Sequence, residues 1–221
     1  MGQLRTESAV FLSAGVPDPS AHHFVGDGDS VAISAAVAAV LEVTLGRRRL
    51  IWGGHPAITP MVWTFAESMG VDYGKWVLLY QSLRFKDDFP DENALFQNVV
   101  FTENVRDEVG PSLELMRERM LGENEFESAV FIGGMKGIID ECQLFARLAP
   151  GARIVPVVST GGAARLLGES LGFGPETAED LDYVRFMYSC LGVDPNERRY
   201  TTPAEQPAAA DARIQVPHAS R

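Results

Sequence analysis

Three pairs of glycine residues follow apolar segments of the sequence, and each pair directly precedes a segment with helical periodicity. The pairs are Gly53–Gly54, Gly133–Gly134 and Gly161–Gly162. Glycine lets the backbone approach a ligand closely, and free N–H groups at the start of the following helix attract anions. Three such turns on one edge of a sheet favour a phosphate-bearing ligand, whereas plain turn geometry is the alternative explanation for each turn alone.

These loops carry neither of the common nucleotide-binding motifs. The Gly-Lys-Ser/Thr of a Walker A loop is missing, and so is the GxGxxG dinucleotide fingerprint. His55 follows the first glycine pair, and we expect it either to contact a ligand or to serve only as a turn residue before Pro56. Arg84 lies just beyond a predicted strand, in a long loop at the same edge, where it could contact a phosphate.

Glu141 is the acidic residue that we expect to face the ligand. In the helix predicted over residues 137–148, Glu141 projects into the apolar stripe while Asp140 points away from it. An acid in the first turn of a helix can serve simply as a cap, but a cap normally lies at the edge of the stripe. An inward-facing acid directly after a glycine loop is therefore expected in the ligand crevice.

Arg119 lies at the flank of the apolar face of the helix predicted over residues 111–121, and Arg117 lies closer to the middle of that face. Residues two positions apart point to different sides of a helix, so the two guanidinium groups cannot share a target. One of them is expected to reach the crevice while the other lies at the surface or pairs with an acid. For Arg117, a solvated position with Glu114 and Glu118 as partners is the alternative.

Short apolar runs alternate with helical segments along the whole chain. Because the runs are continuous rather than alternating in polarity, the pattern indicates a doubly wound, mostly parallel, Rossmann-like α/β sheet with helices on both faces. Strands are expected at residues 8–15, 49–52, 75–81, 98–102, 128–132 and 153–158. Helices are expected at residues 30–45, 60–69, 111–121 and 137–148, in a segment that ends at residue 169, and at residues 180–191.

One domain is expected over residues 1–200, followed by a disordered tail over residues 201–221. The composition of the tail turns to Ala, Pro, Gln and small polar residues. The chain of 221 residues is long enough to bury a core without a disulfide or a metal.

Composition and charge exclude several classes of function. The net charge is −11, so the chain lacks the basic surface that nucleic-acid phosphates need. No apolar stretch approaches the roughly 20 residues of a membrane span, and we expect no membrane partner. The two cysteines form no CxxC pair, which favours a reducing, cytoplasmic location. No carboxylate or Cys stands at ligand spacing from His22 and His23 in the sequence, so no metal site and no cofactor are predicted.

The order of these motifs resembles that of the LOG family, Rossmann-like proteins that include cytokinin-activating phosphoribohydrolases. That family has a Met-His-Glu-Arg-Lys helix and a later Pro-Gly-Gly-x-Gly-Thr-x-x-Glu loop. The chain reads Met-Arg-Glu-Arg-Met over residues 116–120 and Gly-Gly-Met-Lys-Gly over residues 133–137, with Glu141 one turn later. The resemblance implies catalytic positions for Arg119 and Glu141.

The departures from this pattern bring the chain closer to the broader SLOG superfamily. Ile138 stands where LOG proteins have a phosphate-binding Thr, and Met120 stands in place of Lys. The segments VPDP, GGHPAITP, GGMKG and STGGAA resemble those of a bacterial cluster in this superfamily. The resemblance implies binding of nucleotides or NAD-derived molecules, in many cases by sensor modules.

Three functions follow from the resemblance as expectations. The first is binding of a nucleotide or an ADP-ribose-like molecule by a sensor or regulatory module, with Arg119 on phosphate or ribose and Glu141 on the ribose hydroxyls. The second is hydrolysis of the N-glycosidic bond of a nucleoside monophosphate, in which Glu141 stabilises the ribose cation or activates water. The third is an interaction module without a ligand.

A homodimer is expected, and the helix at residues 180–191 could supply its face. The predicted ligand-binding residues are Ser13, Gly15, Gly53, Gly54, His55, Arg84, Gly133, Gly134, Gly137, Thr160, Gly161 and Gly162.

Overall fold

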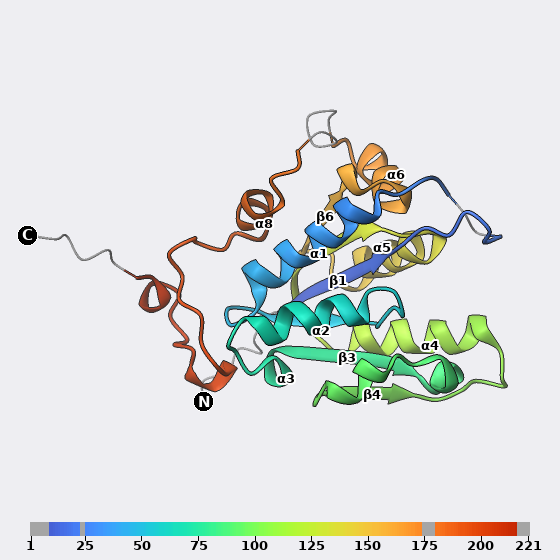
Figure 1. The fold of residues 1–221 in the computed structure, drawn as a ribbon, viewed down its shortest axis with the longest axis horizontal. Coiled ribbons are helices and arrows are strands. Elements are labelled where there is room, and N and C mark those ends of the chain that lie inside the picture. The colour runs from blue at the N-terminus through green and yellow to red at the C-terminus, as the bar shows by residue number, and fades with distance from the viewer. Residues whose placement is uncertain (1–8, 23–24, 174–179, 216–221) are drawn as a thin grey trace, which may run out of the picture.

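The computed structural model describes residues 9–22, 25–173 and 180–215, and it contains a six-stranded sheet with helices on both faces (Figure 1). Every strand pairs in parallel with its neighbour, in the order β4-β3-β2-β1-β5-β6. The predicted α/β, Rossmann-like fold class is thereby confirmed. The strands are β1 (Ala9–Gly15), β2 (Arg49–Trp52), β3 (Val77–Ser82), β4 (Val99–Thr102), β5 (Phe126–Gly133) and β6 (Arg153–Val157).

Three longer helices cover each face of the sheet. One face carries α1 (Ser30–Thr44), α2 (Thr59–Ser68) and α8 (Tyr183–Leu191), and the other carries α4 (Val109–Gly122), α5 (Lys136–Leu148) and α6 (Gly162–Ser170). Side chains of a strand point alternately to the two faces. In β1, Val10 and Leu12 therefore pack with the first group of helices, while Ala9 and Phe11 pack with the second.

The start of α1 shows how local sequence sets the boundaries of these elements. The carboxylate of Asp29 accepts hydrogen bonds from the backbone N–H groups of Val31 and Ala32, as expected of an N-cap. The helix that the sequence offers as a dimer face, α8, packs its buried Tyr183, Met187 and Leu191 into the same core as α1. That apolar face is therefore used within the domain itself.

The topology creates a crevice at one edge of the sheet. The chain adds β2, β3 and β4 on one side of β1, and then returns to place β5 on the other side. The order of strands reverses between β1 and β5, and ligands of open α/β sheets bind beyond the carboxyl ends of the strands at such a reversal. Gly15 ends β1 and Gly133 ends β5, and the two residues are register partners.

The segment between β3 and β4 is more ordered than the sequence predicts. A long loop is expected there, and the structure has two 3₁₀ helices, η1 (Leu83–Asp88) and η2 (Asp91–Leu95). A short helix, α3 (Tyr73–Trp76), also precedes β3 where the sequence predicts an earlier start of the strand. The 3₁₀ segment lies at the carboxyl end of β3, beside the crevice.

Residues 201–215 differ from the disordered tail that the sequence predicts, because they contact the body of the domain. The indole N–H of Trp76 donates hydrogen bonds to the carbonyl oxygens of Tyr200 and Thr201, at 3.1 and 3.0 Å. The side chain of Gln206 donates a hydrogen bond to the carbonyl of Arg47. The segment contains two single turns, η4 (Pro203–Glu205) and η5 (Asp211–Arg213). Residues 216–221 lie outside the described residues.

Among the described residues, none of the helices has both the length and the apolar character that a membrane crossing requires.

Candidate functional site

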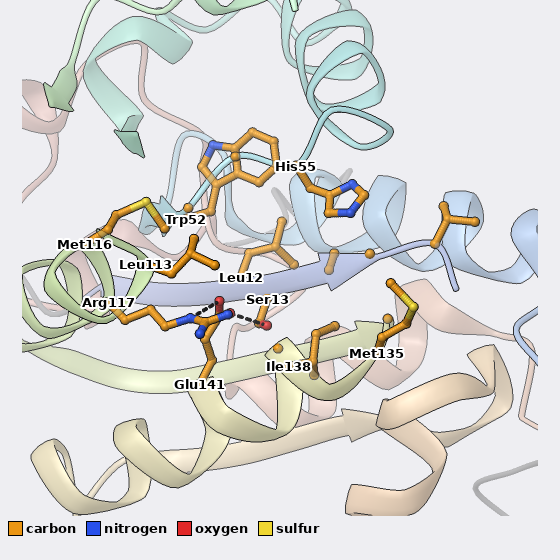
Figure 2. A pocket seen from close by; sticks show the side chains of 17 residues that line it. Leu12, Ser13, Trp52, His55, Leu113, Met116, Arg117, Met135, Ile138 and Glu141 are labelled. Atoms are coloured by element: carbon orange, nitrogen blue, oxygen red, sulfur yellow. Dashed lines mark hydrogen bonds and ion pairs between the residues drawn. The ribbon is translucent and has the colours of Figure 1, made fainter. Parts of the chain in front are cut away.

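A pocket of about 270 Å³ opens at the carboxyl ends of β1, β2 and β5 (Figure 2). Its walls come from these strand ends, from α4 and from the first turn of α5. The pocket therefore lies where the strand order reverses, as the topology requires. Eight of the residues predicted for the site line it: Ser13, Gly15, Gly53, Gly54, His55, Gly134, Gly137 and Glu141.

Glu141 is held from two directions at the floor of this pocket. The hydroxyl of Ser13 donates a hydrogen bond to Oε2 of Glu141 at 2.6 Å, and Nε of Arg117 donates one to Oε1 at 3.0 Å. Figure 2 shows both side chains converging on the carboxylate. Each carboxylate oxygen thus has one protein partner, and an ionised carboxylate offers about four acceptor positions in all. The remaining positions are available to a ligand in the pocket.

The sequence positions two of these side chains, Ser13 and Glu141, through ordinary secondary-structure geometry. Ser13 follows Phe11 by two residues, so both point to the face of the sheet that α4 and α5 cover. Glu141 lies on α5 between the buried residues Ile138 and Cys142, which turns it towards β1. The prediction that Glu141 faces inward therefore agrees with its contact to β1.

Arg117, and not Arg119, brings the guanidinium group to the pocket. Arg119 lies on the exposed side of α4 and forms an ion pair with Glu123 at 2.7 Å, one turn later. The side chains of Arg117 and Glu141 are each only 16% exposed. The expected role of Arg119 at the crevice is corrected accordingly, because the orientation of α4 turns residue 117 towards α5 and residue 119 towards solvent.

Arg117 keeps hydrogen-bonding capacity for a ligand. Its Nη groups have no acceptor among the described residues, and Nη2 lies over the first turn of α5. A Cβ atom built on Gly137 would approach this Nη2 to 2.9 Å, so glycine at this position leaves room for the guanidinium group. No side chain of the described residues caps the N-terminus of α5. A positive group and the N–H groups of Lys136 and Gly137, which have no acceptor among the described residues, therefore meet on one wall, which suits an anion.

His55 has a structural role and a second role that it can offer a ligand. Its carbonyl oxygen accepts hydrogen bonds from the N–H groups of Ile58 and Thr59, and its Nδ1 accepts one from the N–H of Ala57. In the neutral ring, Nε2 must therefore carry the proton. Burial lowers the pKa of His55, while the negative charge of Glu141 opposes this shift. A neutral imidazole thus lines the pocket, and its Nε2–H has no acceptor among the described residues.

The second glycine loop is held close to the end of β1. The N–H of Gly134 donates a hydrogen bond to the carbonyl of Gly15 at 2.7 Å, and the N–H of Gly133 donates one to Oγ1 of Thr160. Gly134 has a φ of +67°, and a Cβ atom there would clash with the side chain of Ile138. Only glycine fits this backbone comfortably.

The third glycine pair supports the pocket without lining it. The N–H of Gly162 donates a hydrogen bond to the carbonyl of Asp27, and Gly161 forms a β-bridge with Gly28. Thr160 is fully buried. Its hydroxyl accepts a hydrogen bond from the N–H of Gly133 and donates one to the carbonyl of Val157. The sequence predicts ligand contact at these positions, and the structure instead uses their polar groups internally.

Arg84 also lies outside the pocket. Its Nε donates a hydrogen bond to the carbonyl of Asp107 at 3.2 Å, and it stands 3.5 Å from the carboxylate of the same residue. Arg84 is thus paired with the loop before α4, and it lines neither this pocket nor the one described below.

A neighbouring pocket contains residues that sequence reasoning passed over. It has a volume of about 420 Å³ and is lined in part by Gln81 at the end of β3 and by Phe85 and Phe89 of the following segment. The signal that could have revealed this pocket is the pair of polar residues, Gln81 and Ser82, at the carboxyl end of a buried strand. Phe85 and Phe89 stand among charged residues in the sequence, so their neighbours do not indicate an apolar pocket.

The thiol of Cys142, beside Glu141, supplies no nucleophile to this site at neutral pH. Burial raises the pKa of Cys142 to about 11, so this thiol is protonated at neutral pH. Within residues 9–22, 25–173 and 180–215, no three His, Cys, Asp or Glu side chains are grouped so that they could hold a metal ion.

A family model described as the SLOG cluster3 family matches residues 23–191. The chain belongs to the SLOG cluster3 family. No curated protein and no solved structure matches it. SLOG membership and the Rossmann-like fold together indicate a nucleotide-related function.

Proposed function

We propose that this SLOG protein binds the ribose and phosphate of a nucleotide or an NAD-derived molecule such as ADP-ribose in the pocket around Glu141, and that it acts as a sensor or regulatory module. The observation that carries the proposal is the Arg117–Glu141 pair at the uncapped N-terminus of α5. The free Nη groups of Arg117 and the helix N–H groups suit a phosphate, and the free acceptor positions of Glu141 suit ribose hydroxyls.

Calorimetric titration with ribose 5-phosphate, AMP, ADP-ribose and NAD tests this proposal. We expect saturable binding of at least the monophosphates, and about tenfold or greater weakening when Arg117 is replaced by Ala. Failure of all four ligands to bind the intact chain would refute the proposal.

Hydrolysis is a second candidate, favoured by the fixed orientation of Glu141. A carboxylate held by Ser13 and Arg117 beside a ribose could stabilise positive charge at C1′ or accept a proton from water. The C1′–N bond would break, the water oxygen would bond to C1′, and the base would leave with a proton. Incubation with nucleoside monophosphates and chromatography for free base separates the two functions. Release of base that Glu141→Gln abolishes would assign hydrolysis, and binding without release would assign sensing.

A further inference from the structure

The second pocket adjoins the first and shares part of its wall. Both pockets are lined by Gly53, Gly54, His55, Leu113 and Met116. Figure 2 shows Leu113 and Met116 projecting from α4 towards the end of β1. At about 420 Å³ the second pocket falls within the roughly 300–1,000 Å³ range of small-molecule sites. A single ligand can therefore place one part in each pocket.

The walls of the second pocket suit a flat, apolar group. Phe85, Phe89 and Pro90 line it from the segment after β3, and Leu113 and Met116 line it from α4. The ring of Phe89 is itself supported, because it stacks on Phe101 with centroids 6.2 Å apart. Aromatic and apolar walls of this kind bind the π-faces of nucleobases.

The charges of the second pocket exclude a phosphate as its occupant. Among its described lining residues, Asp88 is the only carboxylate, and no Lys or Arg is present. Phosphate would be repelled by Asp88 and would find no cation there. The phosphate of a ligand is better placed beside Arg117 in the first pocket, which leaves the base for the second.

Gln81 supplies the polar recognition in this otherwise apolar pocket. It is only 6% exposed, and its Nε2 reaches the carbonyl of Gly53 at a long 3.4 Å. Its Oε1 has no partner among the described residues. A carboxamide presents a donor and an acceptor side by side, which matches the N7 acceptor and 6-amino donor of adenine. Guanine presents two acceptors on that edge and would leave Oε1 facing an oxygen.

We propose that the second pocket binds a 6-aminopurine base through Gln81 and Phe89, and that Gln81 selects adenine over guanine. This inference rests on the proposed function, because it assigns the ribose and phosphate of the same ligand to the first pocket. The ligand is thus an adenine nucleotide or a larger molecule that contains one.

Titration with adenosine, ribose 5-phosphate, AMP and GMP tests the assignment. We expect AMP to bind about tenfold more tightly than GMP, and Gln81→Leu to bring the two affinities within about twofold of each other. Phe89→Ala is expected to weaken AMP and adenosine about tenfold while ribose 5-phosphate changes little. Leu83→Ala is the matched control, because Leu83 begins the 3₁₀ helix η1 that Phe89 follows, but Leu83 is exposed and does not line the pocket.

The fragments distinguish failure of this inference from failure of the proposed function. If ribose 5-phosphate binds in an Arg117-dependent manner but AMP and GMP bind equally, the proposed function stands and the role of Gln81 is overturned. If Gln81→Leu weakens ribose 5-phosphate as much as AMP, the residue has a merely structural role and the inference fails. If ribose 5-phosphate, AMP, ADP-ribose and NAD all fail to bind the intact chain, both proposals are wrong.

Discussion

Nε of Arg117 lies 3.0 Å from Oε1 of Glu141, whereas Arg119, two residues later on the same helix, pairs with Glu123 in solvent. Two positions correspond to about 200° of rotation around a helix, so the two side chains necessarily leave α4 on different sides. The guanidinium at the pocket therefore occupies the second position of the Met-Arg-Glu-Arg-Met segment, where LOG proteins carry His.

Arg117→Ala is expected to weaken binding of AMP by about tenfold or more, because charge-assisted hydrogen bonds to a phosphate contribute roughly 1.5–3 kcal/mol. Arg119→Ala is the matched control on the same helix, and we expect its affinity to stay within about twofold of the parent protein. Calorimetry at one fixed ionic strength compares the two. An equal loss in both variants would show that the effect is a general loss of positive charge and would reject the assignment to Arg117.

Much of this architecture could be predicted from the sequence because it depends on local patterns. Continuous apolar runs alternating with helical periods predicted the parallel sheet, and the inward position of Glu141 followed from the apolar stripe of its own helix. Which of the two arginines, Arg117 or Arg119, reaches the pocket could not be predicted in the same way. It depends on the rotation of α4 against α5, and spacing along one helix does not contain that information.

The long-range contacts were also beyond sequence reasoning. The pattern around the third glycine pair predicts free N–H groups, but Gly162 bonds to Asp27, which lies far earlier in the chain. Residues 201–215 have the composition of a tail, yet hydrogen bonds from Trp76 and Gln206 connect this segment to the domain. Such partners are far apart in sequence, so composition alone does not reveal them.

His55→Asn is expected to change how stability depends on pH. Burial holds the pKa of His55 below its ordinary value of 6.5 in the folded chain. As the pH falls, the unfolded chain therefore takes up a proton before the folded chain does. The contribution of the neutral ring to the free energy of unfolding is fully present above pH 6.5 and is lost as the pH falls through the pKa of the folded chain. Asn keeps an acceptor for the N–H of Ala57 but does not titrate.

Chemical denaturation of both proteins between pH 8 and pH 5, a range of about three units chosen around the ordinary histidine pKa, checks this expectation. The difference in unfolding free energy between parent and variant should be constant at the alkaline end. At the acidic end, the free energy of unfolding of the parent should fall relative to that of the variant. Parallel curves over the whole range would contradict the lowered pKa of His55.

Gly134→Ala is expected to destabilise the fold by about 1–3 kcal/mol, because φ is positive at this residue and the added Cβ would meet the side chain of Ile138. Gly122→Ala is the matched control. Gly122 ends α4, has open space where the methyl group of alanine would lie and should gain slightly from the better helix propensity of alanine. Thermal unfolding of the two variants should therefore shift in opposite directions, and a similar loss in both would reject the strained geometry of the loop.

Trp76→Phe is expected to release residues 200–215 from the domain and to destabilise it by about 1–3 kcal/mol. The indole N–H donates to the carbonyl oxygens of Tyr200 and Thr201, and phenylalanine removes this donor while leaving most of the apolar packing of the 1% exposed side chain. Amide hydrogen exchange should therefore speed up in this segment more than in the strands. Trp63→Phe is the matched control, since Trp63 lies on α2, packs against the core and forms no hydrogen bond to the described part of this segment. Unchanged exchange in Trp76→Phe would mean that other contacts, such as the one between Gln206 and Arg47, suffice to hold the segment.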